Sequence, residues 1–102
     1  MMETILQINF KFDGSRAEYL EAFADAAAPI AASSGLRWKV WPWNDEDQVG
    51  GGIYLFDDAS SAQAFLDGPI AAGLGKHPAV SEISVRRFEI LDRLTAITRG
   101  PV

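Results

Sequence analysis

The stretch from Gly35 to Phe56, GLRWKVWPWNDEDQVGGGIYLF, constrains the fold more than any other part of the chain. Aromatic and β-branched residues flank the polar cluster NDED at 44–47, an order that favours strand, turn and strand. Three consecutive glycines, residues 50–52, lie inside the second predicted strand, where a missing side chain lets a ligand or another backbone approach closely. The stretch therefore predicts a β-hairpin with free space beside it.

The chain has 102 residues, so we expect residues 1–102 to form a single domain with no room for a second. Hydrophobic residues make up 48% and charged residues 23%, the balance of a chain that folds. The net charge of -5 disfavours nucleic acid as a partner, because that binding needs Lys and Arg side chains to neutralise phosphates.

Cysteine is absent, which excludes disulfide bonds, thiolate metal ligands and a cysteine nucleophile. The first residues show no basic segment followed by a long apolar run, and no stretch approaches the length of a membrane span. We therefore expect no membrane partner and a location in the cytoplasm.

Thr4 to Phe12 alternates between apolar and polar residues, the pattern of a half-buried strand. Ser15 followed by Glu18 forms a capping-box signature and predicts the start of a helix. Pro29 predicts a kink or break in that helix, and Gly35 its final stop. The apolar stripe of the helix is expected to contain Leu20, Phe23, Ala24, Ala27, Ile30 and Ala31.

Asp57 and Asp58 offer caps for a second helix, which Gly68-Pro69 should end. Residues 70–74 could add one more turn, and alternation predicts a last strand over residues 80–91. The remaining residues, 92–102, are expected to form a C-terminal tail.

The predicted order is β-α-β-β-α-β, an α+β arrangement of the ferredoxin-like type in which two helices cover one face of an antiparallel sheet. The opposite face would leave Ile83, Val85 and part of the hairpin uncovered. An apolar sheet face on so small a domain predicts a homodimer.

Several segments closely resemble the YdhR family of mono-oxygenases: GLRWKVW, the polar turn after it, GGIYLF, the acidic-serine helix start and Phe65-Leu66. That family belongs to the dimeric α+β barrel superfamily, and the similarity covers nearly the whole chain in element order. The resemblance implies a ferredoxin-like protomer whose sheet packs against that of a second copy, with a ligand cavity between the helices and the sheet of each subunit.

The superfamily's best-understood enzymes oxidise aromatic, quinol-like substrates with molecular oxygen and no added metal or flavin. The resemblance therefore implies a mono-oxygenase without a cofactor, acting on a small aromatic compound. In such an enzyme the substrate is its own reductant, because a deprotonated phenol or enol can pass an electron to oxygen. The protein must supply a dry aromatic pocket, a proton acceptor and donors that hold the anion.

Candidates for these roles come mainly from the hairpin and the residues after it. Tyr54 or His77 could move the proton, and Arg86 or Lys39 could stabilise the anion. The pocket lining is expected from Trp38, Trp41, Trp43, Tyr54 and Phe56, with Asn9 as a polar residue able to orient a carbonyl.

The tryptophans also have structural explanations. Trp38 alternates with Leu36 and Val40 and favours core packing, because most buried tryptophans are structural. Trp41 and Trp43 fall on the other strand face, where either a pocket or a dimer interface could bury them.

The polar candidates have structural explanations as well. Histidine is a residue type suited to a proton shuttle, yet the Lys-His-Pro loop around His77 favours a surface position. Arg86 and Arg87 face opposite sides of the last strand, and an ordinary salt bridge is the more common fate of an inward arginine. Asn9 and Gln7 could simply hydrogen-bond each other.

Two other functions remain open. The superfamily's haem-degrading branch resembles this chain in an asparagine on the first strand and a histidine after the second helix, which Asn9 and His77 could match. The tryptophan that this branch places just before the second helix is Phe56 here, which argues against haem. A non-catalytic dimer that binds or senses a small molecule would use the same pocket without turnover, and residue types do not separate it from an oxygenase.

Overall fold

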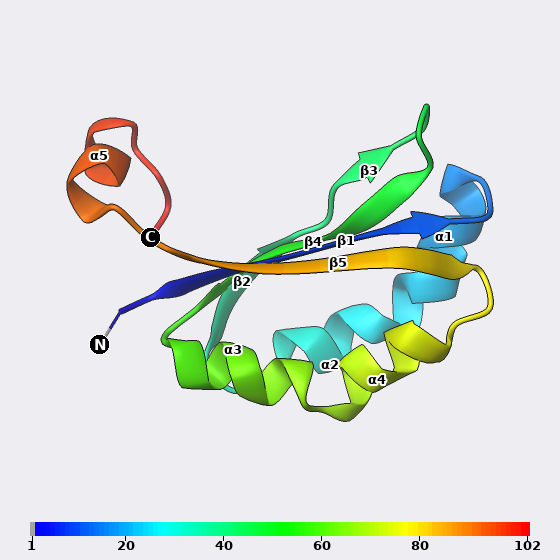
Figure 1. The fold of residues 1–102 in the computed structure, drawn as a ribbon, viewed down its shortest axis with the longest axis horizontal. Coiled ribbons are helices and arrows are strands. Elements are labelled where there is room, and N and C mark those ends of the chain that lie inside the picture. The colour runs from blue at the N-terminus through cyan, green and yellow to red at the C-terminus, as the bar shows by residue number, and fades with distance from the viewer. Residues whose placement is uncertain (1) are drawn as a thin grey trace.

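The computed structural model describes residues 2–102, which form an antiparallel sheet with helices packed on one face (Figure 1). The hydrogen-bonded order is β2-β4-β1-β5, with β3 paired to β4. This is the predicted α+β, ferredoxin-like topology. The strands are β1 (Thr4–Phe12), β2 (Leu36–Val40), β3 (Trp43–Asn44), β4 (Val49–Phe56) and β5 (Val80–Glu89).

The two connections between strands contain the helices that cover the sheet (Figure 1). The first predicted helix is divided into three pieces, whereas the second ends before Gly68-Pro69 as predicted and the extra turn predicted over residues 70–74 is part of a separate helix. The predicted C-terminal tail contains a further helix, α5 (Asp92–Ile97). Within the described residues, none of the helices has the length and apolar character needed to cross a lipid bilayer. The covering pieces are α1 (Arg16–Phe23), the 3₁₀ turn η1 (Ala24–Ala26), α2 (Ala27–Ala31), α3 (Ala59–Leu66) and α4 (Pro69–Lys76).

The first helix begins as predicted but breaks earlier than predicted. The Ser15 hydroxyl accepts from the backbone N–H of Glu18, and the Glu18 carboxylate accepts from the N–H of Ser15, so the capping box is present. The break falls at η1, so the expectation of a break at Pro29 was wrong. Pro29 lies in the first turn of α2, where the missing N–H has no helical partner to lose.

The buried face of α1 is also displaced by one residue from the predicted stripe. Leu20 is 66% exposed, whereas Tyr19 is only 5% exposed. Tyr19 packs against Phe23 at a ring separation of 4.7 Å, the i and i+4 positions of a helix face. The placement of Leu20 in the core was therefore wrong, and an aromatic pair covers the sheet in its place.

The helix-facing side of the sheet is built on β1, where Leu6, Ile8, Phe10 and Phe12 are all buried. In an antiparallel pair, directly opposed residues share a face. Ile8 opposes Gly52 of β4, and Phe10 opposes Gly50. In each pair, the β4 residue therefore contributes no side chain to this face. The glycines inside β4 therefore leave room on this face for side chains from other elements.

Each of these glycines leaves room for a different neighbour. A Cβ at Gly50 would lie 2.6 Å from the Tyr19 ring, and one at Gly52 would overlap the Lys39 side chain. Gly51 has a φ of +141°, and a Cβ there would overlap the carbonyl oxygen of Ile8. Residues 50–52 thus allow close packing. The sequence predicted close approach of either a ligand or another backbone here, and at Gly51 the neighbour is the β1 backbone.

We predict that Gly51→Ala lowers the free energy of unfolding by about 2 kcal/mol or more, because it combines a strained φ with a clash against the β1 backbone. Urea denaturation measures the change. Gly75→Ala is the control, since a Cβ there meets nothing within 4 Å, and helix α4 should gain about 0.5–1 kcal/mol. Equal effects of the two substitutions would contradict the packing described for Gly51.

Candidate functional site

A cavity of about 260 Å³ lies between the sheet and helices α1, α2 and α4. Its volume is just below the range of about 300–1,000 Å³ typical of small-molecule sites, so it suits a small guest. Its walls are mostly apolar, and Lys39 is the only charged residue among them. The aromatic and titratable side chains of the wall are Phe10, Tyr19, Phe23, Lys39, Trp41, Phe65 and His77.

A register shift in β2 decides which hairpin residues face this cavity. Leu36 opposes Phe56, but after the shift Trp38 opposes Leu55 and Lys39 opposes Tyr54. One extra residue in a strand moves the following side chains to the opposite face. Lys39 therefore points toward the helices, and Trp38 points away from them.

The amine of Lys39 lies between two aromatic rings. Its Nζ is 3.1 Å from the centroid of the Trp41 ring and 4.7 Å from that of Tyr54. Burial lowers the pKa of Lys39 from 10.5 to about 7, because the ammonium loses water and gains no carboxylate in the cavity wall. Near neutral pH this amine exchanges a proton readily.

Tyr19 is a functional candidate that sequence reasoning missed. Its phenolic oxygen accepts a hydrogen bond from the backbone N–H of Gly51 at 3.0 Å, which leaves its own O–H free to donate. Burial raises the pKa of Tyr19, so the phenol stays protonated at neutral pH. The signal was present in the sequence, because Tyr19 and Phe23 stand four residues apart after the capping box.

His77 lies at the end of α4 and lines the cavity. Its Nδ1 accepts from the backbone N–H of Ala79 at 3.1 Å, so the neutral ring carries its proton on Nε2. The ring stands 5.5 Å from that of Phe23, in contact with the aromatic cluster. A neutral His77 is thus a hydrogen-bond donor at its free nitrogen.

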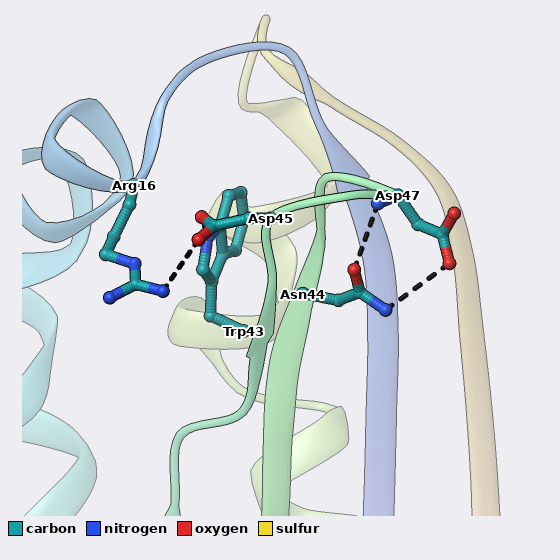
Figure 2. Close-up of polar contacts among 5 residues, drawn as sticks. All are labelled: Arg16, Trp43, Asn44, Asp45 and Asp47. Atoms are coloured by element: carbon teal, nitrogen blue, oxygen red, sulfur yellow. Dashed lines mark hydrogen bonds and ion pairs between the residues drawn. The ribbon is translucent and has the colours of Figure 1, made fainter.

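Trp43 borders the cavity without lining it. Its ring packs 4.8 Å from that of Tyr19, and it lines an adjacent groove along α1 together with Trp41. Asp45 accepts from the Trp43 indole N–H. It also pairs with Arg16 at 2.7 Å, a contact visible in Figure 2. The pKa of Asp45 is lowered mainly by the Trp43 hydrogen bond, so the carboxylate holds this indole in place over a broad pH range.

The turn beyond Trp43 is closed by its own polar side chains (Figure 2). The Asn44 side chain accepts from the backbone N–H of Asp47 at 3.0 Å, and its amide donates to the Asp47 carboxylate at 3.3 Å. Such local bonds replace ladder hydrogen bonds in a turn. The hairpin tip is therefore tied both to itself and to the start of α1.

Tyr54 and Phe56 belong to the packed core beneath the cavity. Tyr54 is 4% exposed and Phe56 is fully buried, and both rings pack against Phe65. Burial raises the pKa of Tyr54, so its phenol does not become a base near neutral pH. Neither residue is among those that line the cavity, although Tyr54 contacts the amine that does.

The structure does not bring Asn9, Trp38 and Arg86 to the cavity. Asn9 accepts from Gln7 at 2.9 Å on the sheet face away from the helices, the mutual pairing foreseen above. Arg86 opposes Gln7 on that same face and is exposed. Trp38 is half-buried there, and its indole donates to the carbonyl of Pro101 in the C-terminal tail.

The residues present do not fit a haem group. A metal-bound histidine normally donates its second ring N–H to a carbonyl or carboxylate, whereas Nδ1 of His77 accepts a hydrogen bond. Asn9, the other residue suggested for haem, lies on the far face of the sheet. No group of three or more His, Asp or Glu side chains within residues 2–102 is arranged to hold a metal ion.

Fold and cavity together define an α+β protein of the ferredoxin-like class with a small apolar cavity between sheet and helices. The family model described as "Putative mono-oxygenase ydhR" matches residues 5–101. The chain therefore belongs to this family, as its sequence resemblance indicated. No curated protein sequence matches the chain.

Solved structures with the same fold are similar over most of the chain. NE2512 from Nitrosomonas europaea, a protein of unknown function, is 26% identical with a TM-score of 0.69, over 89% of this chain and 91% of that one. A variant of SnoaB from Streptomyces nogalater, a cofactor-independent oxygenase, is 22% identical with a TM-score of 0.71, over 89% and 95%. The heme-degrader MhuD from Mycobacterium tuberculosis is 21% identical with a TM-score of 0.64, over 85% and 95%.

The lowered pKa of Lys39 predicts a specific dependence of stability on pH. Between pH 7 and 10.5 the folded protein holds Lys39 neutral while the unfolded chain keeps it protonated, so folding stability gains from rising pH. We expect Lys39→Met to be more stable than the parent below pH 7 and to lose that advantage steadily toward pH 10.5. Melting temperatures of both proteins across this range measure it, and a constant difference would contradict the burial of the amine.

Proposed function

We propose that the protein is a mono-oxygenase that oxidises a small phenol- or quinol-like compound with molecular oxygen, without a metal or flavin. The observation that carries this proposal is the cavity, whose apolar and aromatic wall contains only a few polar side chains. Such a wall excludes water and favours a flat aromatic guest. Tyr19 and His77 supply O–H and N–H donors that suit the oxygen of a phenolate.

The proposed reaction needs no external reductant. The bound phenol loses its proton, and the resulting anion passes one electron to molecular oxygen. Recombination of the two radicals forms a carbon–oxygen bond. One ring C–H then becomes a carbonyl, and the second oxygen atom leaves as water, so that a naphthol and one O₂ give a naphthoquinone and one H₂O.

Membership of the mono-oxygenase family supports this assignment, as does the shared fold of SnoaB, itself a cofactor-independent oxygenase. The substrate class is inferred from the chemistry of the cavity wall. Two of the proposed binding residues, Lys39 and Trp41, come from the hairpin, and a third, His77, follows α4.

Oxygen uptake tests this proposal. We expect 1-naphthol or a related phenol to be oxidised faster with the protein than in buffer, with one labelled atom from ¹⁸O₂ in the quinone product. Ala71 lines the cavity and Ala72 is exposed, so Ala71→Phe should lower kcat/KM by about tenfold or more while Ala72→Phe should not. If the compounds quench tryptophan fluorescence without being oxidised, the protein is a binding or sensing module and the oxygenase proposal fails.

We also propose that two copies pair through the sheet face opposite the helices. On that face Val40 is 54% exposed and Phe88 46% exposed, and Leu94 and Ile97 of α5 are more than half exposed. Exposed apolar side chains of this size are typical of an interface. Light scattering should give twice the 11.1 kDa mass of one chain, and Phe88→Glu should lower it toward one copy. A parent protein of 11.1 kDa at micromolar concentration would contradict the pairing.

A further inference from the structure

Three titratable groups face the cavity. They are Lys39 from β2, Tyr19 from α1 and His77 after α4, and no Asp, Glu or Arg side chain is among the lining residues. Tyr54 of β4 contacts the amine from below. Arg37, two residues before Lys39 in β2, is paired with Glu3 and lies 4.0 Å from Asp57, so those two carboxylates are already engaged by a cation that does not line the cavity.

Three of these four groups are poorly suited to take a proton. Tyr19 and Tyr54 are kept protonated by burial, which raises the pKa of each phenol. His77 has its acceptor nitrogen occupied by the N–H of Ala79, so the nitrogen left free carries a hydrogen. Lys39 alone presents a lone pair when neutral.

The surroundings of Lys39 suit both of its protonation states. Burial without a carboxylate partner lowers the pKa of the amine to about 7, so a large share of it is neutral near neutral pH. The faces of Trp41 and Tyr54 attract a cation at close range, so they stabilise the ammonium once a proton arrives. Gly52 provides the space that lets the lysine stem reach this position across β4.

We propose that Lys39 is the proton acceptor of the cavity, and that it binds its substrate as an ammonium–phenolate pair. The phenolic O–H bond breaks, its electron pair stays on the oxygen, and the proton forms a new bond to Nζ. This inference rests on the proposed function, because it assigns the step that generates the electron-rich anion.

The proposal also narrows the substrate class. Proton transfer is efficient when donor and acceptor have similar pKa values, and an ordinary phenol at about 10 is a much weaker acid than the Lys39 ammonium. A carbonyl conjugated to the ring spreads the negative charge and makes the phenol more acidic. We therefore assign acyl-substituted phenols and the enols of 1,3-dicarbonyl compounds as the class that this site deprotonates.

Binding of 4-hydroxyacetophenone tests the proposal without any oxidation. Its anion absorbs at longer wavelength than its neutral form, and at about pH 7.5 the free compound is mostly neutral. Under nitrogen, the parent protein should produce the phenolate band on binding, with far less than one proton released to the buffer. Proton release is measured by calorimetry in two buffers of different ionisation enthalpy.

Two variants separate a proton acceptor from a simple counter-ion. Lys39→Met should lose the phenolate band and bind at least about tenfold more weakly. Lys39→Arg keeps a permanent cation that accepts no proton, so it should form the band while releasing nearly one proton per bound molecule. Circular dichroism spectra and melting curves confirm that both variants are folded.

Several results would overturn the assignment. The parent protein could fail to bind the compound, or bind it in its neutral form. Lys39→Met could show an unchanged phenolate band, or the parent could release one full proton per bound molecule. Failure of the proposed function is a separate outcome, because a phenolate band under nitrogen with no oxygen uptake in air leaves Lys39 as the acceptor and removes only the oxygenase.

Discussion

The absence of side chains along one short segment of β4 is the constraint on which the rest of the site depends. Gly50 makes room for the ring of Tyr19, and Gly52 makes room for the stem of Lys39. Gly51 adopts a backbone conformation that other residues rarely reach, and its N–H fixes the Tyr19 hydroxyl. A strand made of three ordinary residues would fill this space and exclude both polar side chains from the sheet.

The chemistry of the cavity follows from the same geometry. Because the Lys39 stem lies over a glycine of the neighbouring strand, its amine is removed from water and meets aromatic rings but no carboxylate, so burial destabilises its ammonium. The phenol and the imidazole beside it are oriented by backbone groups, which leaves each as a donor. One base and two donors within an apolar wall are a suitable set of groups for forming and holding an organic anion.

Local patterns predicted the elements well, because strand alternation and helix caps depend on neighbours in sequence. The strand at Thr4–Phe12, the hairpin and the capping box at Ser15 were all confirmed. It was harder to predict which side chains reach the cavity, since the register shift in β2 reverses the faces of Trp38 and Lys39. Nothing local encodes that shift. Dimerisation and cytoplasmic location stay predictions.

A direct titration of the Lys39 side chain by NMR tests the central claim most sharply. The sequence contains only three lysines, so Lys39→Met identifies the signal by its disappearance. The account predicts a midpoint at about pH 7, set by burial of the amine between Trp41 and Tyr54. A midpoint close to the ordinary value of 10.5 would show that the amine is in water, and would contradict the account.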